Sequence, residues 1–150
     1  MNNFIEQEKR SQFIIYTDGA CDPNPGPGGW AAVILQDGGV RELSGHKDHT
    51  TNNRMELTAA IHALEALPQG SQVILYTDSQ YLQRGIEEWL PVWQKKGWRR
   101  KGGKLANVDL WQELTKLIQQ NHVRWGWIKG HGGHFYNERA DYLAQARCLK

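Results

Sequence analysis

The sequence predicts an α/β fold with a mixed five-stranded sheet and helices on both of its faces. Segments 13–19 and 73–79 echo each other, since each is a β-branched and aromatic run that stops on an aspartate and then breaks at Gly or Ser. Apolar runs without alternation are typical of strands covered on both faces, so these two belong to a central sheet. Extended stretches around Asp37-Gly38-Gly39 indicate an antiparallel hairpin, whereas helical segments separate the later strands. We therefore expect three antiparallel strands and two parallel ones.

The first half of the chain supplies the antiparallel strands and one long helix. Its expected elements are a strand at 12–18, a Pro/Gly-rich turn at 21–29, strands at 29–36 and 40–45, and then a helix. Thr51 and the two asparagines after it predict the N-terminal cap of that helix, which reaches Leu67 and is ended by Pro68 and Gly70.

The second half alternates helices with the two remaining strands. Ser79 is suited to capping a helix after the strand at 72–77, and Pro91 should divide that helical region into two short helices. The elements expected to follow are a basic loop at 97–106, a helix at 108–120, a Trp-rich strand at 122–128 and a last helix at about 137–148.

Length and composition favour one domain, 12–150, preceded by a polar extension at 1–11. No apolar run reaches membrane-spanning length, and the first residues lack the basic and apolar regions of a signal peptide, so we expect a cytoplasmic protein with no membrane contact. Cys21 and Cys148 form no CxxC pair, which argues against a disulfide scaffold or a zinc ribbon.

The net charge of +2 conceals an uneven distribution. Residues 95–104, part of a basic protrusion at about 91–106, hold six of the 18 basic residues and none of the 16 acidic ones. The rest of the chain therefore carries 12 basic against 16 acidic residues. This pattern suggests a polyanion that is gripped at one place and processed at another.

Asp18 and Asp78 end the two echoing strands, at the sheet edge where α/β folds build their ligand sites. Two carboxylates side by side resist ionising unless a cation lies between them. A divalent cation held by carboxylates typically acts on a phosphate ester. The alternative interpretation is that each aspartate merely starts a turn.

Two further acids lie on the apolar sides of their helices. Glu65 falls on the polar face of the first long helix, whereas Glu56 lies along the small residues Ala60 and Ala63, where a carboxylate is costly without a cationic partner. A first-turn glutamate that interacts with the helix dipole is the alternative. Asp141 similarly flanks the inner stripe of the last helix, despite the poor helix propensity of aspartate. Asp18, Glu56, Asp78 and Asp141 could thus converge at one end of the sheet.

Several motifs resemble those of bacterial type 1 ribonuclease H, in order and without a large gap from about residue 12 to 148. They are TDG at 17–19, NPGPGG at 24–29, TNNRMEL at 51–57, TDSQY at 77–81, KGH with a second histidine at 129–134, and NERAD at 137–141.

The resemblance implies the ribonuclease H-like fold and an endonuclease that hydrolyses the RNA strand of RNA–DNA hybrids. Two Mg²⁺ ions, or Mn²⁺ as a substitute, would support in-line cleavage that leaves 3′-hydroxyl and 5′-phosphate ends, and the cellular role would be removal of RNA primers and hybrids during replication. The family's metal-binding acids map onto Asp18, Glu56, Asp78 and Asp141, and its mobile catalytic histidine maps onto His131. We expect a monomer.

His131 lies in a Gly-rich loop and titrates near neutrality, which suits a proton carrier or an aid to product release. The alternative is that His131 and His134 bind zinc, but no third or fourth ligand lies near them in the sequence.

The expected substrate contacts fall into two groups. Trp89 and Trp93, four residues apart on one helical face, would form a platform beside the basic loop, whereas Trp30, Trp125 and Trp127 are assigned to the core. Polar residues near the acids are candidates for reading 2′-hydroxyls or the DNA backbone. The full set is Cys21, Asn24, Thr51, Asn52, Gln80, Trp89, Trp93, Lys95, Lys96, Arg99, Arg100 and Lys101.

Two other classes of protein compete with this interpretation. A transposase or integrase core shares the fold, but it typically uses three acids and needs additional end-binding domains. A non-catalytic hybrid-binding module would keep the basic loop and the tryptophans without needing all four acids.

Overall fold

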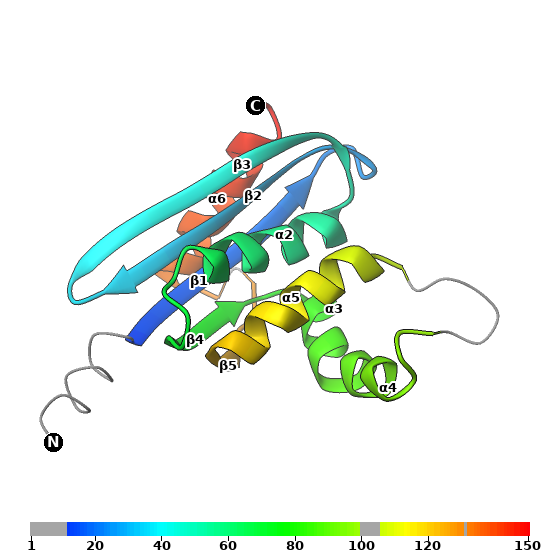
Figure 1. Ribbon diagram of the computed structural model, residues 1–150. Coiled ribbons are helices and arrows are strands. Elements are labelled where there is room, and N and C mark those ends of the chain that lie inside the picture. The colour runs from blue at the N-terminus through cyan, green and yellow to red at the C-terminus, as the bar shows by residue number, and fades with distance from the viewer. Residues whose placement is uncertain (1–11, 100–105, 131) are drawn as a thin grey trace, which may run out of the picture.

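A mixed five-stranded sheet forms the centre of the protein, as the sequence predicts, and helices cover both of its faces (Figure 1). The computed structural model describes residues 12–99, 106–130 and 132–150, so the predicted extension at 1–11 lies outside the described residues. The strand order is β3-β2-β1-β4-β5, with antiparallel pairing among β1 to β3 and parallel pairing of β4 with β1 and β5. The strands are β1 Gln12–Cys21, β2 Gly26–Gln36, β3 Gly39–Thr50, β4 Gln72–Thr77 and β5 His122–Trp127.

The pairing of β1 with β4 brings the two echoing segments side by side. Tyr16 pairs with Tyr76 in the parallel register, so Asp18 and Asp78 each lie two residues beyond that pair. Asp78 directly follows β4, whereas β1 continues beyond its predicted end at residue 18 to Cys21. β1 is flanked by β2 on its other side, where Asp18 pairs with Ala31. Asp18 is therefore held at the middle of the sheet.

The predicted hairpin is confirmed, although both of its strands are longer than expected. Asp37 and Gly38 adopt φ values of 49° and 78°, the left-handed pair that a tight two-residue hairpin turn requires. β3 continues to Thr50 as an edge strand whose side chains are mostly exposed or half-buried. The prediction ended this strand too early because it relied on apolar residues, which an exposed edge strand does not need.

Three longer helices pack on the sheet. α2 (Asn52–Glu65) begins where predicted, since the Thr51 hydroxyl accepts a hydrogen bond of 3.2 Å from the Arg54 N–H, and it ends two residues before the predicted end. α5 (Val108–Gln120) has the predicted bounds and lies beside α2 (Figure 1). α6 (Phe135–Arg147) covers the opposite face, near β1 and β2 (Figure 1).

The segment after β4 stays helical throughout, so the prediction that Pro91 divides it was wrong. α3 (Gln80–Arg84) is capped by Ser79 as predicted, and it continues through the π-helical turn η1 (Gly85–Trp89) into α4 (Leu90–Lys95). Pro91 is the second residue of α4, directly after the π-helical turn, and the helical backbone continues through it. The irregularity falls instead at Gly85, where an added Cβ would lie 2.0 Å from the Trp111 ring.

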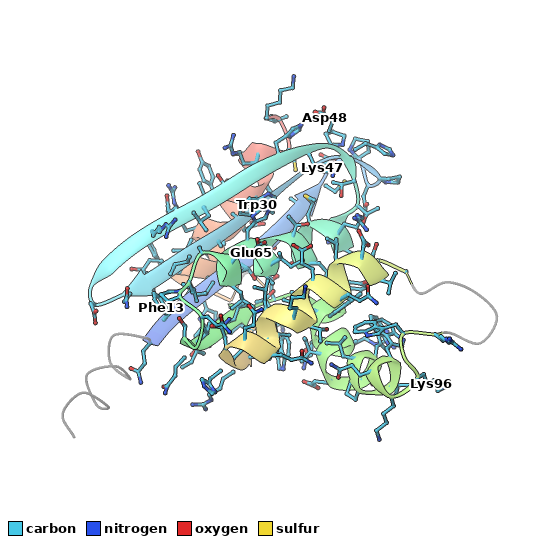
Figure 2. All side chains as sticks on the ribbon, viewed as in Figure 1. Phe13, Trp30, Lys47, Asp48, Glu65 and Lys96 are labelled. Atoms are coloured by element: carbon cyan, nitrogen blue, oxygen red, sulfur yellow. The ribbon has the colours of Figure 1, made fainter. Side chains whose placement is uncertain are left out.

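The main core fills the space between the sheet and the helices α2, α3 and α5. Trp111 is fully buried in it, and Trp125 and Trp127 pack against it as predicted. The assignment of Trp30 to the core was wrong, because its ring does not pack against this core and instead stacks on exposed His62 with the ring centroids 4.2 Å apart (Trp30 is labelled in Figure 2). Among the described residues, no helix has both the length and the apolar character needed to cross a membrane.

Candidate active site

Three of the predicted acids meet at the carboxyl end of the central strands. Asp18 ends the apolar part of β1, Asp78 follows β4, and Glu56 lies in the second turn of α2. One carboxylate oxygen from each of the three lies within 4.8 Å of the others. The convergence that the strand ends predicted is therefore present, and we call these three residues together with Asp141 the acid cluster.

Asp141 comes to the cluster from the opposite face of the sheet. It lies in the middle of α6, is half-buried, and accepts a hydrogen bond of 3.1 Å from the Gln145 side chain one turn later. It is close enough to Asp18 to raise the pKa of that carboxyl. The inner face of α6 that positions it consists of small residues, since Ala140 and Ala144 are fully buried.

Burial dominates the electrostatics of the acid cluster. Asp18 is 5% exposed and Glu56 is 4% exposed. Burial, followed by the charge of Asp78, raises the pKa of Asp18 to about 8. Burial, followed by the charge of Asp18, raises the pKa of Glu56 well above its usual range. Without a cation, the folded protein therefore favours the protonated forms of Asp18 and Glu56, as expected for like charges held together.

Gly19 allows the two most buried acids to approach each other. A Cβ at this position would lie 2.4 Å from the Glu56 backbone nitrogen, so only glycine lets the end of β1 touch the start of α2. Its N–H also donates a hydrogen bond of 2.9 Å to Asp18 Oδ1. The prediction that the strand breaks at Gly19 was wrong, since β1 continues through it to Cys21. The steric role of Gly19 has no local signal in the sequence.

The acid cluster has the chemistry of a divalent-cation site. Glu56 Oε2 is buried and has no hydrogen-bond partner among the residues that the structure describes. A buried, unpartnered carboxylate oxygen is costly unless a cation binds it. Because every side chain in the set offers carboxylate oxygen, the donors suit hard cations such as Mg²⁺ or Mn²⁺ better than zinc.

Four predicted substrate contacts gather beside the start of α2. The Asn52 N–H donates a hydrogen bond of 3.1 Å to the Asn24 side-chain oxygen, and the Cys21 thiol lies 3.4 Å from the Thr50 carbonyl oxygen. Thr51, next in the chain, caps the helix. Gln80 is exposed at the start of α3, two residues after Asp78.

The two tryptophans predicted as a platform have a packing role as well. Trp89 and Trp93 stack with their centroids 5.8 Å apart, and the Trp93 ring meets the edge of buried Trp111 at 5.9 Å. Both remain half-buried, so part of each ring faces solvent.

The basic residues that the structure describes after these tryptophans are exposed. Lys95, Lys96 and Arg99 are in this group, and Lys96 points away from the body of the protein (Figure 2). Arg100 and Lys101 lie outside the described residues, as does the predicted catalytic residue His131.

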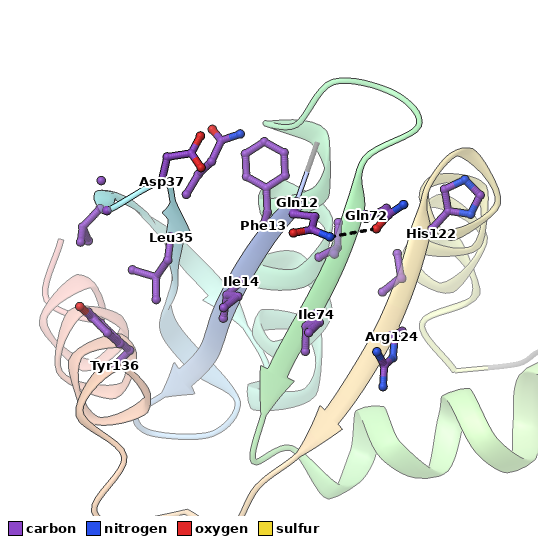
Figure 3. Close-up of a pocket in the computed structure, with 16 residues that line it drawn as sticks. Gln12, Phe13, Ile14, Leu35, Asp37, Gln72, Ile74, His122, Arg124 and Tyr136 are labelled. Atoms are coloured by element: carbon purple, nitrogen blue, oxygen red, sulfur yellow. Dashed lines mark hydrogen bonds between the residues drawn. The ribbon is translucent and has the colours of Figure 1, made fainter. Parts of the chain in front are cut away.

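A cavity of about 960 Å³ lies away from the acid cluster, at the other end of the sheet (Figure 3). Its walls come from the starts of β1, β4 and β5, and the Gln12 side chain donates to Gln72 Oε1 across 3.4 Å (Figure 3). None of the predicted site residues within the described ranges lines it. The candidate active site is therefore identified by its crowded acidic side chains and not by the presence of a large cavity.

The fold and the acid cluster together define an α/β protein whose carboxylates could hold a divalent cation. The family model for RNase H matches residues 10–148, and the chain belongs to the ribonuclease H family. It is 58% identical to the ribonuclease H of Hahella chejuensis over 131 residues, which cover 87% of this chain and 88% of the relative. It is 53% identical to the ribonuclease H of Thiobacillus denitrificans over 137 residues, or 91% and 93% of the two chains.

Solved structures agree with this assignment. LC9-RNase H1, a type 1 RNase H with the type 2 active-site motif, superposes with a TM-score of 0.83 at 33% identity, over 93% of this chain and 72% of that one. LC11-RNase H1, solved in complex with an RNA/DNA hybrid, superposes with a TM-score of 0.70 at 26% identity, over 91% and 96% of the two chains. The predicted family and fold are therefore confirmed.

Proposed function

We propose that this protein cleaves the RNA strand of RNA–DNA hybrids endonucleolytically, leaving 3′-hydroxyl and 5′-phosphate ends. The observation that carries the proposal is the acid cluster, in which one oxygen from each of three carboxylates lies within 4.8 Å of the others and the buried Glu56 Oε2 has no hydrogen-bond partner in the described residues. The family supplies the reaction class, and the hybrid bound to LC11-RNase H1 supports the choice of substrate.

The acid cluster would hold two Mg²⁺ ions, for which Mn²⁺ could substitute. Bound there, the cations would supply charge neutralisation on the phosphodiester and activation of the attacking water. Asp18, at the middle of the sheet, would be shared between the two sites. Glu56 and Asp78 would hold the side of the leaving 3′-oxygen, and Asp141 the side of the attacking water. His131 would carry a proton or assist product release, because a loop imidazole titrates near neutral pH.

Two sets of residues would bind the substrate, namely the basic protrusion and the polar residues beside the acid cluster. Lys95, Lys96, Arg99, Arg100 and Lys101 would neutralise phosphates of the DNA strand, and the exposed parts of Trp89 and Trp93 would contact its sugars. Asn24, Asn52 and Gln80 would read 2′-hydroxyls of the RNA strand in the minor groove, with Thr51 and Cys21 on the DNA backbone. We further propose a cytoplasmic monomer that removes RNA primers and hybrids during replication.

One assay tests the reaction against its competitors. An RNA–DNA hybrid labelled on either strand is incubated with the protein and Mg²⁺, and the products are separated by size. We expect internal cleavage of the RNA strand alone, with none when the metal is chelated or when both strands are DNA. Joining of DNA ends would indicate a transposase-like activity. Retention of an intact hybrid would indicate a binding module, and either result would overturn the proposal.

A further inference from the structure

Gly130, just after β5, presses its backbone against the carboxylate of Asp78. A Cβ added to Gly130 would lie 2.8 Å from Asp78 Oδ2 and 3.4 Å from its Cγ. Gly130 is not among the glycines with positive φ, so its backbone conformation is one that any residue can adopt. Space alone therefore opposes a side chain at this position, and the atoms in the way belong to the Asp78 side chain.

The surrounding backbone has little freedom to make more room. The Ile128 N–H donates a hydrogen bond of 3.1 Å to the Thr77 carbonyl, which ties the segment before Gly130 to the strand end that carries Asp78. The Ser79 N–H donates a hydrogen bond of 3.1 Å to the Thr77 hydroxyl, which holds the other side of Asp78. The group that can yield is the Asp78 carboxylate, by rotating about its side-chain bonds.

This distinguishes Gly130 from Gly19, the other glycine of the site. At Gly19 an added Cβ would strike the backbone of α2, so alanine there would separate two elements of the fold. At Gly130 the nearest atoms belong to a side chain. An alanine at Gly130 should therefore leave the fold intact and displace one cation ligand.

We infer that Gly130 is a positioning residue for the cation site, one that keeps the Asp78 carboxylate in register with Asp18 and Glu56. The inference rests on the proposed cation binding. Residues that hold a metal ligand in place typically change metal affinity by about 10- to 100-fold when they are altered. Gly130→Ala should accordingly weaken Mg²⁺ binding without weakening the grip on the hybrid.

The test is the Mg²⁺ concentration that gives half of the cation-dependent rise in Tm, measured without substrate. We expect this midpoint to rise about tenfold or more in Gly130→Ala. The metal-free Tm and the KM for hybrid should stay close to those of the parent. Gly132→Ala is the matched control in the same loop, because its Cβ would meet the Lys129 carbonyl oxygen at 3.0 Å and no carboxylate. Its midpoint should match that of the parent.

The possible outcomes distinguish failure of the proposed cation site from failure of the inference about Gly130. If the parent shows no Mg²⁺-dependent rise in Tm, the proposed cation site fails and the inference fails with it. A normal midpoint in Gly130→Ala overturns the inference alone, as does an equal shift in Gly132→Ala. If Gly130→Ala instead loses metal-free stability, the same substitution is made in an Asp78→Ala background. A clash with the carboxylate predicts that most of the loss disappears there, and an undiminished loss overturns the inference.

Discussion

The acid cluster differs from the aromatic segment formed by α3, η1 and α4 in whether its polar side chains find hydrogen-bond partners. In the aromatic segment the Tyr81 hydroxyl accepts hydrogen bonds from the Trp111 indole at 3.0 Å and from the Asn107 amide at 2.9 Å. In the acid cluster, Glu56 Oε2 has no such partner within the described residues, and burial raises the pKa of both Asp18 and Glu56. Satisfied polar groups stabilise the fold, whereas acids crowded together without a cation destabilise it.

The two regions also differ in how the chain assembles them. The aromatic segment is nearly continuous in sequence and needs only α5 to complete it, whereas the acid cluster draws on β1, α2, α6 and the end of β4. If the acid cluster cleaves the substrate and the basic residues beside the aromatic segment bind it, substitutions in the cluster should abolish cleavage and leave the affinity for hybrid intact. Substitutions of those basic residues should lower the affinity for hybrid and leave cleavage by the bound complex intact.

The largest effect should come from Asp78→Asn. Loss of one negative cation ligand should lower Mg²⁺-dependent cleavage by about 10³-fold or more. Binding of hybrid should persist, because other side chains are proposed to grip it, and metal-free stability should stay level or rise as repulsion is relieved. The measurements are cleavage rate, hybrid affinity and Tm in chelator. Full activity with Mg²⁺ would show that the site is misassigned.

His131→Ala should have the next largest effect, a fall in kcat of about 10- to 1000-fold, which is the range of proton-transfer contributions. KM should barely change, because the imidazole acts on reacting groups or departing product and does not anchor the hybrid. The measurement is steady-state kinetics of both parameters. His134→Ala serves as the control and should lose less activity. Equal losses that zinc reverses would identify the two histidines as metal ligands.

Neutral replacements of Lys95, Lys96, Arg99, Arg100 and Lys101 test the gripping region. KM should rise with kcat little changed, and the slope of log KM against log salt should fall by up to about 0.9 for each phosphate that is no longer neutralised. The experiment compares KM across a salt series in parent and variant. Coinciding slopes would mean that these residues form only a solvated surface.

The smallest effect should be on the pH dependence of stability. Because burial raises the pKa of Asp18 to about 8, the folded protein holds a proton that the unfolded chain releases near pH 4. Metal-free stability should therefore be greatest at the acidic side of this window and fall as pH rises from about 5 to about 8. Asp18→Asn should flatten this fall, as measured by Tm in chelator at each pH. An unchanged slope would mean that Asp18 is already ionised in the folded state.

Much of the fold followed from local signals in the sequence. The strand at 72–77 and the helix at 108–120 have the predicted bounds, because apolar runs and helix ends depend on nearby residues. The convergence of Asp18 and Asp78 was also predictable, since equivalent positions on parallel neighbours meet at one sheet edge. Glu56 was recognisable as a carboxylate on the buried side of a helix.

The rest depended on interactions between distant segments. The π-helical turn lies where Gly85 faces Trp111, and nothing near Gly85 in the sequence announces that ring. Trp30 lies outside the core because its ring stacks on the exposed His62, a residue of the following helix. Gly130 gains its significance from Asp78, a residue about 50 positions earlier, so no local pattern could single it out.

The placement of Asp141 on α6 has a consequence for protein synthesis. α6 follows all five strands in the chain, yet it packs back over β1 and β2, the first to be made (Figure 1). During translation the first three acids emerge from the ribosome well before the fourth, and α6 can dock only after its own residues have left the exit tunnel. If Asp141 is a cation ligand, as we propose, we expect the nascent chain to lack cleavage activity until α6 has docked. The order of elements would thus postpone nuclease activity until translation of the domain is complete.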